Sequence, residues 1–217
     1  ALMINTPNNP TGSVMDEETM RQIAEIAVKH DILVISDDVY NTLLYDGAKN
    51  TCIAAFPGMK ERTAVVNSLS KSWRIGFVAG PAELVSAMTK CQENFNACAN
   101  APGQYAGTVA LAHPELCEEL RKVFENRRRL LLDGLKGIKG IESNDPKGAF
   151  YVFADISSFG LSSADFCNRL LDEQKVVCIP GSAFGACGEG FIRIAYTCSD
   201  SDLVEAVARI KTFCESL

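Results

Sequence analysis

The sequence predicts an α/β fold, in which part of a mostly parallel sheet is followed by a smaller α+β domain. Over the first half of the chain, short apolar runs of strand length alternate with helical patterns, the order expected of layered α/β proteins. One run, ILVIS at residues 32–36, is apolar throughout, which is typical of a strand covered on both faces. Near Pro114 a long, heavily charged helical pattern begins. We therefore predict one domain over residues 1–113 and a second over residues 114–217, which begins with that helix.

The first region opens with ALMIN at residues 1–5, a short strand that the turn-forming TPNNPTG ends. A helix is predicted next, because Asp16 can cap it and apolar residues recur behind it at helical spacing: Met20, Ile23, Ala24 and Ala27. After ILVIS, two further strands are predicted from the apolar runs TAVVNSLS at 63–70 and IGFVAG at 75–80.

The second region opens with a helix for which Pro114 suits the first turn. Its apolar residues gather on one side: Leu116, Leu120, Val123, Leu130 and Leu131. Ser162 and Asp165 form a capping-box pattern before another helix, and Ser199 can cap the last one. Strands are predicted from the apolar runs GAFYVFADI, VVCIP and GFIRIAYT.

Composition excludes several classes of protein. Of 217 residues, 47% are hydrophobic and 22% charged, the balance of a globular protein with a core, and no apolar run approaches the roughly 20 residues of a membrane helix. A net charge of −6 argues against a nucleic-acid or membrane surface. Nine scattered cysteines without a C-x-x-C pair indicate reduced thiols and a cytoplasmic location. His30 and His113 lie far apart, so we expect no metal site. Because the chain starts inside an apolar run, we expect it to be part of something longer.

Three charged residues are candidates for chemistry. Asp37 follows the strand ILVIS, and ligands of parallel sheets bind beyond the carboxyl ends of strands, although an acid there can equally start a turn. Arg193 interrupts the apolar run GFIRIAY, so it either points to solvent from an edge strand or binds an anion with its planar fork. Lys71, in SLSKSWRIGF, would by itself be read as a solvated lysine.

Taken in order, six short motifs carry a resemblance. NNPTG, ISDDVY, SLSK, WRIGF, GAFYVF and FIRIAY follow one another over the whole chain. This order resembles the fold-type I pyridoxal-phosphate transferases, in particular the class I/II group that includes the aspartate aminotransferases. The resemblance implies that the chain is the C-terminal part of such an enzyme: a portion of the large cofactor-binding domain followed by the small domain.

The resemblance also implies pyridoxal 5′-phosphate as the cofactor and assigns contacts to its ring. Lys71 would form the Schiff base with the cofactor aldehyde and later carry the proton that moves during transamination. Asp37 would pair with the protonated pyridine nitrogen, since a fixed carboxylate favours the charged form by opposite charge. Asn9 and Tyr40 would hydrogen-bond the phenolic oxygen.

The remaining roles concern the phosphate and the substrate. By the same resemblance, Ser68 and Arg74 would hold the cofactor phosphate with help from Ser70, and Arg193 would bind the α-carboxylate of the amino acid. The implied reaction is transamination between an L-amino acid and a 2-oxo acid, and the implied assembly is a homodimer when the protein is full length. No nucleic-acid or membrane partner is expected.

The spacing between Lys71 and Arg74 departs from the family. The two residues stand three positions apart, whereas the family usually has eight. A tryptophan is a poor residue for so short a turn, so we expect that about five residues are absent as a loop rather than deleted from the protein. Two other functions stay open: a lyase, decarboxylase or synthase that uses the same cofactor, and a non-catalytic effector-binding domain of the same fold.

Overall fold

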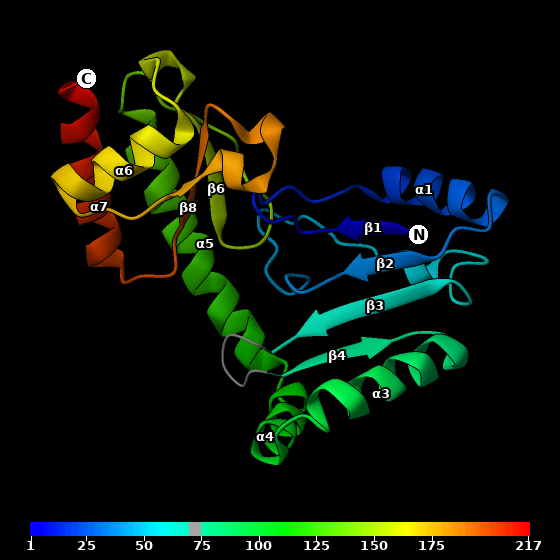
Figure 1. Cartoon of the computed structure of the whole chain (residues 1–217). Coiled ribbons are helices and arrows are strands. Elements are labelled where there is room, and N and C mark those ends of the chain that lie inside the picture. Colours follow the sequence, from blue (N-terminus) through cyan, green and yellow to red (C-terminus); the bar gives the residue numbers. More distant parts are fainter. Residues whose placement is uncertain (70–74) are drawn as a thin grey trace. The chain divides into compact units, whose positions relative to one another are not determined.

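The computed structural model describes residues 1–69 and 75–217, which form two compact units. The first unit contains residues 1–7 and 14–119, and the second contains residues 8–13 and 120–217. Figure 1 shows the elements of both. The short segment at residues 8–13 is therefore built into the second unit, although its neighbours in sequence belong to the first.

The first unit is built on a four-stranded sheet. Its strands are β1 (Leu2–Asn5), β2 (Val34–Asp37), β3 (Thr63–Ser68) and β4 (Gly76–Ala79), and they lie in that order. β1, β2 and β3 are parallel, whereas β4 runs antiparallel to β3. With α1 in the connection between β1 and β2, this arrangement confirms the predicted α/β class.

Helix α1 (Glu17–Lys29) covers one face of this sheet. Asp16 accepts a hydrogen bond from Thr19 N at 2.7 Å, which confirms the predicted N-cap. Met20, Ala24 and Ala27 face the strands, as their spacing predicts. They share a buried core with Ile4 of β1, Val34 of β2, Ile53 of the 3-10 helix η1 (Ile53–Ala55) and Met59 in the turn after η1.

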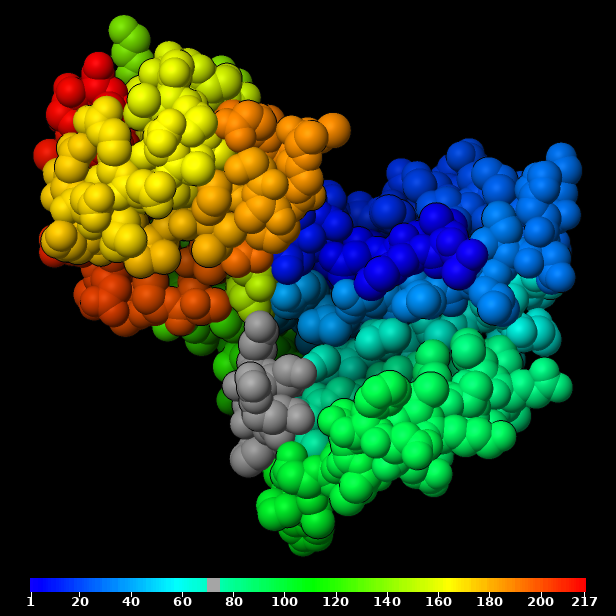
Figure 2. All heavy atoms as spheres, in the orientation of Figure 1, coloured from blue at the N-terminus to red at the C-terminus, as the bar shows by residue number. Residues whose placement is uncertain are grey.

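The first unit continues with α3 (Ala82–Asn96) and α4 (Ala101–Leu111), for which the sequence analysis made no prediction. α3 has no buried residue, and only two glycines of α4 are buried. Their side chains form the green surface in Figure 2. Large apolar side chains are exposed on both helices, among them Phe95, Tyr105 and Leu111.

The second unit holds a separate antiparallel sheet. It consists of β5 (Glu142–Ser143), β6 (Tyr151–Asp155), β8 (Phe191–Ala195) and β7 (Ile179–Pro180), in that order. The helices are α5 (Glu115–Lys136), which starts in the first unit, α6 (Ser163–Gln174) and α7 (Asp200–Glu215). Three 3-10 turns complete it: η2 (Ser157–Phe159), η3 (Gly181–Phe184) and η4 (Ala186–Gly188).

The helix starts of the second unit follow the prediction. Ser162 Oγ accepts from Asp165 N at 3.1 Å, and Ser199 Oγ accepts from Asp202 N at 3.1 Å. The strand predicted from VVCIP is shorter than expected, because only Ile179 and Pro180 pair with β8. Lys175 adopts a left-handed conformation at the end of α6, and the chain has to leave that turn before it can pair.

One expectation about the chain is wrong. The expected loop of about five residues is not part of the 217-residue sequence, in which Ser72 and Trp73 alone separate Lys71 from Arg74. The three-position spacing belongs to the chain itself. In the part of the chain that the structure describes, no helix is long and apolar enough to cross a membrane.

Candidate functional site

Polar side chains gather where the parallel strands of the first unit end. Asn5, Asp37 and Ser68 are the last residues of β1, β2 and β3. Asn5 pairs with Asp37 in the strand register, and its Nδ2 donates to the Asp37 carbonyl oxygen at 3.1 Å. The carboxyl edge of this sheet is therefore a polar edge, the place where parallel sheets bind ligands.

Two acids stand side by side here but have different surroundings. Asp38 is 3% exposed, and Ser36 Oγ donates to its carboxylate at 2.6 Å, so it is a satisfied structural acid. Asp37 is half-buried, and within the described residues its carboxylate accepts only a long contact from Val39 N, 3.4 Å. No lysine or arginine in residues 1–69 and 75–217 pairs with it. Asp37 can thus accept a hydrogen bond from a cationic ligand.

The other residues predicted for the cofactor are placed as follows. Tyr40 is buried in the turn after β2. Ser68 is half-buried, and its hydroxyl lies 3.4 Å from the Ile75 carbonyl oxygen. Ser70, Lys71 and Arg74 lie outside the described residues.

Arg193 and Asn9 meet within the second unit. Arg193 Nη1 donates to Asn9 Oδ1 at 2.8 Å, although the two residues are 184 positions apart. The guanidinium also lies against two aromatic rings, 4.4 Å from the centroid of Tyr151 and 4.8 Å from that of Phe184. Aromatic faces attract a cation, so these rings hold the side chain in place without neutralising its charge.

The charge of Arg193 has no anionic partner in the described part of the chain. Its Nε is buried and makes no hydrogen bond there, and a buried donor without a partner costs about 1–3 kcal/mol. The strand that carries it, β8, lies between β6 and β7, which excludes the edge-strand alternative. The arrangement suits an anion bound at the free side of the guanidinium, as the fork of an arginine binds a carboxylate.

The sequence analysis missed the aromatic rings. Tyr151 lies in β6, far from Arg193 in sequence, whereas Phe184 ends η3 and precedes Arg193 by nine positions. The alternation in GAFYVF could have suggested an aromatic face, but it does not say which strand lies opposite.

The loop that carries Asn9 is held by its own side chains and by the segment after β5. Asn8 Oδ1 accepts from Thr11 N at 3.2 Å and from Thr11 Oγ1 at 2.9 Å. Gly148 N donates to the Gly12 carbonyl oxygen at 2.9 Å. Gly12 has a φ of +65°, and a Cβ added there would lie 2.4 Å from Pro146 Cβ. Only glycine fits this contact.

We therefore predict that Gly12→Ala lowers the free energy of unfolding by about 2–4 kcal/mol, the sum of a left-handed backbone and an overpacked contact. Urea unfolding of the intact native protein measures it. Gly160→Ala is the matched control: its φ is +66°, but nothing lies within 4 Å of the added Cβ, so only the backbone part of the loss is expected. Equal losses in the two variants would contradict the tight contact at Gly12.

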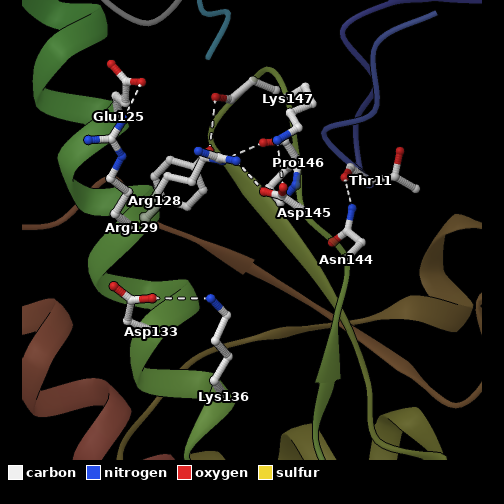
Figure 3. A network of polar contacts seen from close by, with 12 residues as sticks. Thr11, Glu125, Arg128, Arg129, Asp133, Lys136, Asn144, Asp145, Pro146 and Lys147 are labelled. Carbon is white, nitrogen blue, oxygen red and sulfur yellow. Dashed lines mark hydrogen bonds and ion pairs between the residues drawn. The ribbon is translucent and has the colours of Figure 1, made fainter. Parts of the chain in front are cut away.

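A second polar network lies next to this loop. Arg128 of α5 is 2% exposed, its Nε donates to the Pro146 carbonyl oxygen at 2.6 Å, and its Nη2 pairs with Asp145. Lys147 pairs with the same carboxylate at 2.6 Å. Figure 3 shows these side chains together. Burial raises the pKa of Asp145, but the hydrogen bond from Lys147 and the charge of Arg128 outweigh it, so the pKa is lower than usual.

In the part of the chain that the structure describes, the buried thiols and the possible metal ligands give no second site. Burial raises the pKa of Cys178 to about 12 and that of Cys167 to about 11, so both stay protonated at neutral pH. Within residues 1–69 and 75–217, no three His, Cys, Asp or Glu side chains are grouped so that they could hold a metal ion.

The chain is similar to known proteins over most of its length. The profile of the family described as aminotransferase class I and II matches residues 1–210. The aromatic-amino-acid aminotransferase 2 of Thermococcus litoralis is 43% identical over 97% of this chain and 56% of its own. The aspartate aminotransferase of Pyrococcus abyssi is likewise 43% identical over 97% of this chain and 56% of its own. The crystal structure of an aromatic aminotransferase from Pyrococcus horikoshii superposes with a TM-score of 0.94 at 38% identity, over 99% of this chain and 59% of that one.

These matches confirm the resemblance found in the sequence and the fold that it implies. The chain spans little more than half the length of the proteins it matches, 56% of both aminotransferases named above, and corresponds to their C-terminal part.

Proposed function

The chain belongs to the aminotransferase class I and II family, and from that premise we propose that the intact protein transfers an amino group between an L-amino acid and a 2-oxo acid with pyridoxal 5′-phosphate as cofactor. The names of the relatives support amino transfer over the lyase, decarboxylase and effector-domain alternatives. The first unit would then be part of the cofactor-binding domain, and the second would contain the small domain.

The observation that carries the proposal is Arg193. Its guanidinium lies against Tyr151 and Phe184, is hydrogen-bonded to Asn9, and has a buried Nε without a partner in the described residues. A carboxylate bound there would accept two parallel hydrogen bonds and neutralise the charge. Every L-amino acid and every 2-oxo acid carries such a carboxylate, so one arginine can bind both substrates.

The residues at the edge of the first sheet fit the cofactor. Asp37 is half-buried and unpaired with any described cation, which suits the protonated nitrogen of a pyridine ring. Tyr40 and Asn9 would donate to the phenolic oxygen, while Ser68, Ser70 and Arg74 would hold the phosphate. When bound, pyridoxal 5′-phosphate supplies an electron sink for breaking bonds at the α-carbon of the substrate.

Lys71 would be the group that moves protons. Its uncharged amine would take the proton from the α-carbon, and the ammonium so formed would then give that proton up again, so the lysine would act first as a base and then as an acid. A hydrophobic, cationic neighbourhood would favour the uncharged form by lowering the pKa of the amine.

Cofactor attachment tests the proposal directly. When the intact native protein is incubated with pyridoxal 5′-phosphate and reduced with borohydride, peptide mapping is expected to find the cofactor on Lys71. Lys90, an exposed lysine of α3, is the internal control and should carry none. Label spread evenly over exposed lysines, or absent, would contradict the assignment of Lys71.

Assembly and location are part of the same proposal. The resemblance supports a homodimer for the intact protein, which sedimentation can measure, and the scattered cysteines without a C-x-x-C pair support a cytoplasmic location.

A further inference from the structure

The contact between Arg193 and Asn9 is one link in a closed ring of interactions. All members of this ring belong to the second unit. Arg193 lies in β8, and the strand register places it opposite Phe153 of β6. Asn9 lies in the loop at residues 8–13, which has no regular secondary structure to keep it in place. Besides the hydrogen bonds within the loop, contacts that join it to β6 therefore contribute to how Asn9 meets Arg193.

The side chain of Asn144 makes such a connection. Asn144 Oδ1 accepts from Phe153 N at 3.1 Å, which ties it to the residue opposite Arg193. Its Nδ2 donates to the Thr11 carbonyl oxygen, two residues after Asn9. Figure 3 shows Asn144 pointing toward Thr11. The ring thus runs from Arg193 through Asn9, Thr11, Asn144 and Phe153 back to Arg193.

The segment that carries Asn144 is itself anchored. The next two residues, Asp145 and Pro146, are the ones that Arg128 holds through an ion pair and a hydrogen bond of 2.6 Å. Arg128 is 2% exposed and projects from α5, the long helix of this unit. Gly148 N adds a hydrogen bond to the Gly12 carbonyl oxygen at 2.9 Å. The segment that carries Asn144 is therefore fixed by contacts of its own, so the Asn144 side chain can hold the loop at residues 8–13 in place.

We propose that Asn144 is a positioning residue: it holds the Asn9 amide against Arg193, so that the buried Nε side of the guanidinium faces the substrate carboxylate. The inference rests on the proposed function of Arg193 and extends it to a residue outside the six motifs. Both groups of the amide are needed, since the oxygen binds the strand and the NH₂ binds the loop.

Replacing Asn144 should weaken carboxylate binding more than it slows chemistry. Small misplacements of a substrate-orienting group can cost up to about 100-fold. In the intact native protein, Asn144→Ala is expected to raise KM for the amino acid about 10-fold while kcat changes less than about 3-fold. Asn144→Asp keeps an oxygen that can accept from Phe153 N but has no proton to donate to the Thr11 carbonyl oxygen. We therefore expect it to raise KM as much as Asn144→Ala does. If the side chain served only the strand, Asn144→Asp would behave as the wild type.

Asn126→Ala is the matched control. Asn126 is another exposed asparagine of the second unit, and its Nδ2 donates to Asp200 at 3.0 Å, outside the ring. The Asn126→Ala variant is expected to have the same KM for the amino acid as the wild type. Melting temperatures of the three variants, measured alongside, should stay close to that of the wild type, because both asparagines are exposed.

A readout without turnover separates this inference from the proposed function. Succinate, an unreactive dicarboxylate, is titrated calorimetrically into the wild type and the variants, with about a 10-fold weaker affinity expected for Asn144→Ala and Asn144→Asp. Unchanged succinate affinity and unchanged KM would overturn the inference while leaving amino transfer intact. If the wild type binds succinate about 10-fold more tightly than the Asn144 variants but transfers no amino group, the proposed function alone is overturned. A wild type that neither binds nor reacts would overturn both.

Discussion

Lys71→Ala is expected to lower the rate of amino transfer by the intact protein about 10⁴-fold or more. The lysine is proposed both to hold the cofactor covalently and to move the proton at the α-carbon, and proton transfer by a positioned base alone contributes about 10²- to 10⁴-fold. The measurement is the steady-state rate with an amino acid and 2-oxoglutarate at saturating cofactor.

Lys90→Ala serves as the control for Lys71→Ala. It removes an exposed lysine of α3 and should keep the wild-type rate. A Lys71→Ala variant that retained more than about a hundredth of the wild-type activity would show that another group performs the chemistry.

Replacing Arg193 is expected to have the second largest effect. Arg193→Gln removes the positive charge that would meet the substrate carboxylate, and loss of a buried charged partner costs about 2–5 kcal/mol. We expect kcat/KM to fall about 10²- to 10³-fold, mostly through KM, because the carboxylate is bound in both the ground state and the transition state.

Arg193→Lys separates charge from geometry. The lysine keeps the charge but has neither a second parallel donor nor a planar group that could lie against Tyr151 and Phe184. We therefore expect most of the fall in kcat/KM to remain. Arg209→Lys is the control, because Arg209 forms an i,i+4 pair with Glu205 on α7 and should tolerate the change. Full activity of Arg193→Lys would mean that a point charge suffices and that the forked contact is not made.

Elements specified by local chemistry could be predicted from the sequence. Asp16, Ser162 and Ser199 each cap a helix as predicted, because an N-cap needs only a short polar side chain and the backbone N–H groups that follow it. The helices α3 and α4 were not predicted. α4 contains a proline and two glycines, which have low helix propensity, and α3 has no buried apolar face in the described chain.

In the second unit, the sequence alone predicted Arg193 as a candidate but not the aromatic residues around it. Arg193 could be singled out because a guanidinium in an apolar strand needs an explanation. The contact with Tyr151 depends on the strand register and the contact with Phe184 on the course of the chain after η3, and no local pattern reports either. Asn144 was not noticed, since an exposed asparagine two residues before a proline is read as an ordinary turn residue.

Nitrogen tracing tests the central claim most directly. The intact native protein, supplied with pyridoxal 5′-phosphate, is incubated with a mixture of ¹⁵N-labelled L-amino acids and unlabelled 2-oxoglutarate, and the products are separated by mass. Labelled glutamate, formed by the wild type and not by Lys71→Ala, is the result that amino transfer predicts. Label recovered as free ammonia, or retained wholly in the starting amino acids, would contradict it.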